Sequence, residues 1–188
     1  MNAANEHETG MTRRVQDARP AAAREPSGLL WLPVTVAVIV LDQLVKLWIV
    51  HHLVVYRTVR LLPVLDITLT YNRGAAFSFL AEASGWQKWL FAGLAVAVAA
   101  GIVVWLSRLG GRSQRLLCLS LTLILGGALG NLIDRLRIGH VVDFIVAHWH
   151  GVYFPWAFNV ADSAITVGAA LLLLDAMLES RGPKKENV

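Results

Sequence analysis

The stretch LLCLSLTLILGGALGNLI, residues 116–133, contains no charged side chain. An α-helix rises about 1.5 Å per residue, so a run of this length nearly spans the roughly 30 Å hydrocarbon core of a bilayer. Three other long apolar segments accompany it, over residues 29–50, 86–106 and 157–178. The chain is therefore expected to cross a membrane four times.

The composition agrees with a membrane protein. Of the 188 residues, 56% are hydrophobic and 16% are charged, whereas soluble domains have about 45–50% and about 25%. The net charge is +4, but the basic residues lie between the apolar segments, so no nucleic-acid partner is expected. The single cysteine, Cys118, lies in an apolar run and is expected to pack as a small hydrophobic side chain.

Lysine and arginine residues outside the apolar segments predict the orientation, because short cytoplasmic loops collect positive charge. Ten lie in the N-terminal arm, the second loop and the tail, and five lie in the first and third loops. Both termini are therefore expected in the cytoplasm. We expect a disordered arm over 1–28, a four-helix domain over 29–180 and a tail over 181–188. The first apolar segment is longer than a typical signal-peptide core, so we interpret it as a retained anchor.

The two outward loops differ in pattern. Residues 54–59 and 65–71 alternate between apolar and polar side chains and are rich in β-branched residues, which predicts two short strands. Residues 138–156 are rich in histidine and aromatic residues, which favours an amphipathic segment at the membrane interface. The expected fold class is a membrane all-α protein with four transmembrane helices, a small extramembrane β-sheet and an interfacial segment on the outer side.

Ionisable residues inside the apolar segments are costly, at about 2.5–3.5 kcal/mol or more each, and usually face the interior of a helix bundle. Asp42 and Lys46 are four residues apart, so they share a helix face and are expected to form a structural ion pair. Asn131, Asp134 and Arg135 share another face at the end of the third segment.

Two further acids are placed near the same side of the membrane. Asp143 follows the third segment, and Asp162 lies five residues into a fourth helix that is expected to begin near Ala157. Two carboxyl groups in a poorly solvated site do not easily ionise together, which allows one to act as a base and the other as an acid. A proton-coupled transporter that uses Asp42, Asp134 and this pair as a relay remains an alternative.

Other chemistries have weaker support in the sequence. His148 and His150 have no cysteine or third histidine at ligand spacing, so a metal site is not expected. The glycine-rich and serine-centred motifs of nucleotide-binding proteins and serine hydrolases are absent from the sequence.

Five short motifs occur in order between residues 29 and 178, and together they resemble those of the lipoprotein signal peptidase, or signal peptidase II, family. They are Asp42-Gln43-x-x-Lys46, Asn72-x-Gly74-Ala75-Ala76-Phe77, Gly127-Ala128-x-Gly130-Asn131-x-x-Asp134-Arg135, Val142-Asp143-Phe144 and Phe158-Asn159-x-Ala161-Asp162-Ser163.

The resemblance implies an aspartic endopeptidase of the bacterial inner membrane, with its site near the outer face. Such an enzyme removes signal peptides from prolipoproteins, cutting just before a cysteine that carries diacylglycerol. The implied partners are these substrates and membrane lipid; a monomer is expected, and no cofactor or metal. The implied roles are catalysis for Asp143 and Asp162, substrate binding for Asn72, Gly74, Asn131, Arg135 and Asn159, and structural support for Asp42, Lys46 and Asp134.

Overall fold

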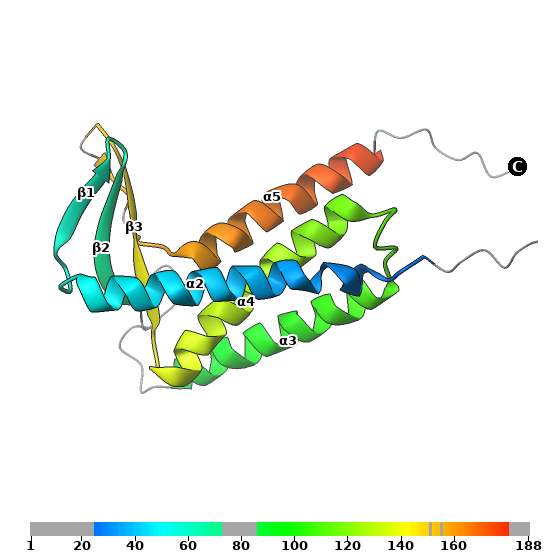
Figure 1. Cartoon of the computed structure of the whole chain (residues 1–188), viewed down its shortest axis with the longest axis horizontal. Coiled ribbons are helices and arrows are strands. Elements are labelled where there is room, and N and C mark those ends of the chain that lie inside the picture. The colour runs from blue at the N-terminus through cyan, green and yellow to red at the C-terminus, as the bar shows by residue number, and fades with distance from the viewer. Residues whose placement is uncertain (1–24, 73–85, 151, 155, 181–188) are drawn as a thin grey trace, which may run out of the picture.

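The computed structural model describes residues 25–72, 86–150, 152–154 and 156–180 (Figure 1). Four long helices in these ranges are apolar enough to cross a membrane. They are α2 (Leu32–His52), α3 (Trp86–Arg108), α4 (Arg115–Arg137) and α5 (Val160–Ser180), and a 3₁₀ turn, η1 (Gly28–Trp31), precedes α2. Each of the four expected apolar segments is thus a helix, which confirms the expected four-helix membrane fold.

Helix α4 is the centre of the bundle. It packs against α2, α3 and α5, and more of its surface is buried than that of any other described helix. Small residues on α4 permit this close packing. A Cβ atom at Gly127 would collide with the backbone oxygen of Ala161 and come within 2.7 Å of Ile165 Cγ1 on α5, and one at Gly130 would lie 2.9 Å from Asp42 Oδ2 on α2.

Gly127→Ala is therefore expected to push α5 away from α4 and to lower the free energy of unfolding by about 1–3 kcal/mol. Gly101→Ala is the matched control, because a Cβ atom there has no neighbour within 4 Å. This control should be neutral or slightly stabilising, since alanine favours a helix over glycine. Thermal unfolding in detergent compares the two variants, and equal melting temperatures would contradict the packing argument.

The extramembrane sheet has four antiparallel strands in the order β1-β2-β3-β4. They are β1 (Thr58–Leu62), β2 (Leu65–Asn72), β3 (Val141–Trp149) and β4 (Val152–Tyr153). Figure 1 shows the sheet lying across one end of the helix bundle, opposite the start of α2 and the end of α5. A buried cluster of Ile49, Leu69, Val142 and Phe144 joins the end of α2 to β2 and β3.

Three local predictions need correction. The first strand was expected over 54–59 but begins at Thr58, because the chain first turns after α2 and Tyr56 has a positive φ of 62°. Residues 138–156 were interpreted as an amphipathic interfacial segment, and no strands were predicted there. Most of this stretch forms β3 and β4. Helix α5 begins at Val160 rather than near Ala157, so Asp162 lies in its first turn.

The start of the first membrane helix is fixed at the end of the bundle away from the sheet. The Glu25 carboxylate accepts a hydrogen bond of 2.7 Å from the Arg112 N–H, and Trp31 Nε1 donates to the Gly111 oxygen at 2.8 Å. The Gly28 N–H donates to the Leu109 oxygen at 2.9 Å. These bonds tie residues 25–31 to the loop between α3 and α4.

Candidate active site

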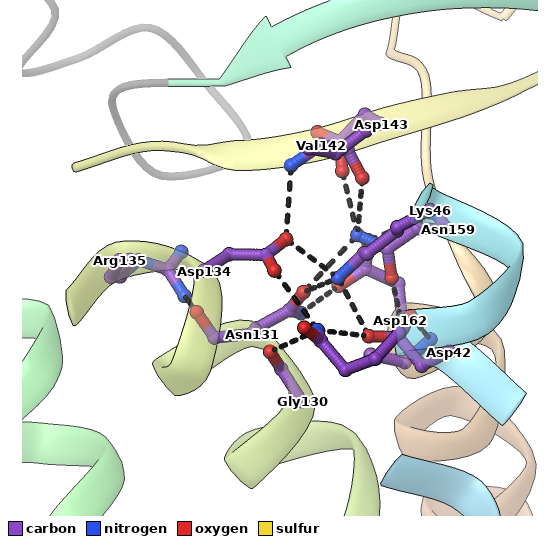
Figure 2. Close-up of polar contacts among 12 residues, drawn as sticks. Asp42, Lys46, Gly130, Asn131, Asp134, Arg135, Val142, Asp143, Asn159 and Asp162 are labelled. Carbon is purple, nitrogen blue, oxygen red and sulfur yellow. Dashed lines mark hydrogen bonds and ion pairs between the residues drawn. The ribbon is translucent and has the colours of Figure 1, made fainter. Parts of the chain in front are cut away.

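Asp143 lies on β3, which passes over the end of α4 and the start of α5 (Figure 2). Its side chain is almost completely buried, at 2% exposure. One carboxyl oxygen accepts a hydrogen bond of 3.0 Å from Asn72 Nδ2 at the end of β2, and the other accepts one of 2.7 Å from Asn159 Nδ2. The strand itself is aligned by the pairing of Asp143 with Thr70 on β2. Three separate chain segments therefore fix this carboxyl group.

Asp162 lies in the first turn of α5 and forms a capping box with Asn159. Asn159 Oδ1 accepts a hydrogen bond of 2.9 Å from the Asp162 N–H, and Asp162 Oδ2 accepts one of 3.2 Å from the Asn159 N–H. The other oxygen, Oδ1, accepts a hydrogen bond of 2.7 Å from Asn131 Nδ2 on α4. The start of α5 thus orients one carboxyl oxygen, and Asn131 on α4 orients the other.

Asn159 connects the two acids. Its amide nitrogen donates to Asp143 while its amide oxygen caps the helix that carries Asp162. The side chain is completely buried, and the same nitrogen also lies 3.1 Å from Asn131 Oδ1 and 3.3 Å from the Val142 oxygen. One amide group therefore sets the relative positions of the two carboxyl groups.

The environment of Asp143 favours its protonated form. Burial of the carboxyl group, together with the nearby carboxylate of Asp162, raises its pKa from 3.8 to about 7. The hydrogen bonds from Asn72 and Asn159 and the charge of Lys46 oppose this increase but do not cancel it. Two acids that share a site in this way can hold different protonation states near neutral pH.

Lys46, on α2, contacts three side chains. Its Nζ atom is 2.8 Å from Asp42 Oδ2, 2.9 Å from Asp134 Oδ2 and 3.1 Å from Asn131 Oδ1. Lys46, Asp42 and Asp134 are all buried. The geometry of the expected Asp42–Lys46 ion pair is present, and Asp134 from α4 joins it as a second carboxylate.

The remaining candidate residues line the same region. Arg135 is half-buried, donates to the Asn131 backbone oxygen at 3.3 Å and lies with its guanidinium carbon 5.5 Å from the centre of the Phe91 ring on α3. Gly74 lies outside the described residues. The structure therefore brings together every described residue that the motifs singled out.

One residue of the cluster had no role in the sequence analysis. Gln43 donates to Asp134 Oδ1 at 2.9 Å and to Asp42 Oδ2 at 3.2 Å, so it completes the hydrogen bonding of both acids. It occurs in the first motif beside Asp42, and a polar residue in an apolar helix is a signal that could have drawn attention to it.

Comparisons with known proteins agree with this architecture. The family model described as signal peptidase (SPase) II matches residues 34–178. The lipoprotein signal peptidase of Pseudomonas fluorescens is 54% identical over 157 residues, which cover 83% of this chain and 92% of that protein. The lipoprotein signal peptidase of Shewanella halifaxensis is 50% identical over 159 residues, covering 85% and 92%.

A solved structure has the same fold. It is a bacterial membrane enzyme determined by the in meso method at 2.3 Å resolution, with a TM-score of 0.73 and 29% identity, and the match covers 85% of this chain and 94% of that one. The four membrane helices, the sheet across their end and the matched family model lead to one conclusion. The chain belongs to the signal peptidase II family.

Proposed function

We propose that Asp143 and Asp162 are the catalytic pair of this signal peptidase II. The observation that carries the proposal is the single buried amide of Asn159, which bonds to one acid and caps the helix of the other. A pair of carboxyl groups coupled in this way suits the hydrolysis of a peptide bond by an activated water. Because the chain belongs to this peptidase family, the proposed function is proteolysis and not the proton-coupled transport considered as the alternative.

The two acids have different roles in the proposed reaction. Asp162 receives donors from Asn131 Nδ2 and the Asn159 N–H at the positive end of α5, which matches an ionised carboxylate that accepts the proton of the attacking water. Asp143, with its pKa near 7, keeps a proton and donates a hydrogen bond to the oxygen of the scissile carbonyl. As the C–N bond breaks, this proton passes to the leaving amine.

The proposed substrates are prolipoproteins whose cysteine carries diacylglycerol, with cleavage just before that cysteine. Asp143 lies on β3 and Asp162 lies in the first turn of α5, at the end of the apolar helices where the sheet lies (Figure 1), which supports a substrate bound at a membrane surface. We also propose that Asn72, Gly74, Asn131, Arg135 and Asn159 contact the substrate. Asn72, Asn131 and Asn159 already bond to the two acids, so these amides border the place where a peptide bond would lie.

The test is a comparison of two forms of one prolipoprotein with purified enzyme. We expect the diacylglyceryl form to be shortened and the unlipidated form to be cleaved poorly or not at all, because each buried methylene contributes about 0.8 kcal/mol to binding. Mass spectrometry locates the new N-terminus at the lipidated cysteine. Equal cleavage of both forms would contradict the proposed substrate class.

The pH dependence follows from the proposed roles. Because Asp143 must be protonated and its pKa is about 7, kcat/KM should fall as the pH rises through about 7. It should fall again at low pH, where Asp162 takes up a proton and no longer accepts one from water. Initial rates measured from about pH 4 to about pH 9 check this profile. A rate that stays constant between about pH 6 and about pH 8 would refute the role of Asp143 as the acid.

We further propose that the enzyme lies in the inner membrane with both ends in the cytoplasm and the sheet on the outer side. The ten basic residues in the arm, the second loop and the tail support this orientation. We also propose that the enzyme acts as a monomer, because one copy of the chain supplies both acids and the amides that hold them.

A further inference from the structure

The two carboxylates beside Lys46 each accept a hydrogen bond from the backbone next to a proposed catalytic acid. Asp134 Oδ2 accepts a hydrogen bond of 3.2 Å from the Val142 N–H, immediately before Asp143. Asp42 Oδ1 accepts one of 2.9 Å from the Ala161 N–H, immediately before Asp162. Figure 2 shows the first of these hydrogen bonds, between Val142 on β3 and the Asp134 side chain.

Lys46 joins the two contacts. Its Nζ atom binds both carboxylates, at 2.8 Å for Asp42 and 2.9 Å for Asp134, from a position that is 3% exposed. Its third contact is Asn131 Oδ1, and because an ammonium group only donates, this contact fixes the amide so that Nδ2 faces Asp162. A single cation thus connects to both acids through short chains of hydrogen bonds.

The direction of each bond explains why the cation is needed. Each carboxylate accepts one backbone N–H, and without Lys46 two negative groups would lie close together in a buried region, where repulsion separates them. The loss of the cation would therefore loosen β3 and the start of α5 relative to each other. Lys46 can hold β3 and the start of α5 in this way without touching the substrate.

We propose that Lys46 is a positioning residue that sets the spacing of Asp143 and Asp162 through Asp134 and Asp42, in an arrangement we call the Lys46 fork. The fork consists of Lys46, Asp42 and Asp134 with their bonds to the Ala161 and Val142 N–H groups. The expected effect of Lys46 on the reaction rate rests on the proposed catalytic pair. Its expected effect on the backbone of β3 and α5 rests on the hydrogen bonds alone.

The first experiment uses Lys46→Met, which removes the cation and keeps most of the side-chain volume. In purified, folded protein we expect kcat to fall about 100-fold with KM within about threefold of the wild type, because the proposed substrate contacts of Asn72, Arg135 and Asn159 do not involve Lys46, whereas the acids lose their spacing. Hydrogen exchange at the Val142 and Ala161 amides, followed by NMR, should become at least about tenfold faster. A kcat within about fivefold of the wild type would overturn the proposal.

Asp42→Asn and Asp134→Asn provide a second test that does not depend on the folding of Lys46→Met. Each variant keeps the size of the side chain but weakens one arm of the fork, that is, the bonds from Lys46 through one carboxylate to one backbone N–H. Asp134→Asn should speed exchange at Val142 and leave Ala161 unchanged, and Asp42→Asn should do the reverse. Equal changes in hydrogen exchange at both amides in each variant would overturn the proposal that each carboxylate holds one of the two amides.

Thr35→Val is the matched control. Thr35 is a buried polar residue on the same helix, and it donates to the Thr122 oxygen on α4 at 3.0 Å. Its loss should lower the melting temperature without changing kcat, KM or exchange at the two amides. If the wild type fails to cleave a lipidated prolipoprotein, the proposed function fails, whereas the exchange rates still test the Lys46 fork.

Discussion

Asp143→Asn and Asp162→Asn are each expected to lower cleavage of a lipidated prolipoprotein by about 10³-fold or more, with normal amounts of protein in the membrane. Both changes preserve the shape of the side chain and remove its ability to exchange a proton. The structure makes the two losses dependent on each other, because Asn159 holds both groups in one site. The double variant should therefore be scarcely less active than either single variant.

Asp66→Asn is the control for this experiment. Asp66 is a buried acid on β2, where it lies 3.3 Å from His148 Nε2, 3.3 Å from the Tyr153 hydroxyl and 3.8 Å from Arg60 Nε. Its removal should leave the activity of the folded enzyme unchanged. Substantial cleavage by either purified single variant of the proposed pair, free of wild-type enzyme, would refute that pair.

The second large effect is expected for Asn159→Ala. This change removes the donor to Asp143 and the cap of α5 together, so activity should fall about 100-fold. The free energy of unfolding should also fall by about 2–3 kcal/mol, since a helix cap is lost and buried polar groups lose a partner. Cleavage rates and thermal unfolding measure the two effects separately.

Asn159→Ser separates the cap from the connection to Asp143. A serine at this position caps a helix well but cannot also donate to the Asp143 carboxyl group, so stability should recover in part while activity remains low. Full recovery of activity in Asn159→Ser would show that the helix cap alone matters.

The membrane helices could be predicted from the sequence because bilayer thickness imposes a length and a composition that can be counted directly. The sheet was harder to predict. β3 is a nearly continuous apolar run from Val141 to Val146, which is typical of a strand buried on both faces and equally of other buried segments. The local alternation at 54–59 predicted a strand where the connection from α2 requires a turn.

In the site, as in the fold, contacts between residues close in the sequence could be predicted, and contacts between distant residues could not. The Asp42–Lys46 pair was predictable because it depends only on helical spacing. The third member, Asp134, is 88 residues beyond Lys46 by its number and joins the pair only through packing of α2 on α4. The capping box of Asn159 and Asp162 is not evident from the sequence, because the apolar pattern places the start of α5 near Ala157, three residues before its actual start at Val160.

The order of the site residues along the chain has a consequence for synthesis. Asn72, Asn131 and Asp143 all precede Asn159 and Asp162, and the ribosome makes them first. Until residues 159–162 emerge and α5 enters the bilayer, Asp143 lacks its donor from Asn159 and Asn131 has no carboxylate to orient. A nascent chain that stalls before α5 therefore carries one acid of the proposed pair without the other, and we expect it to have no cleavage activity.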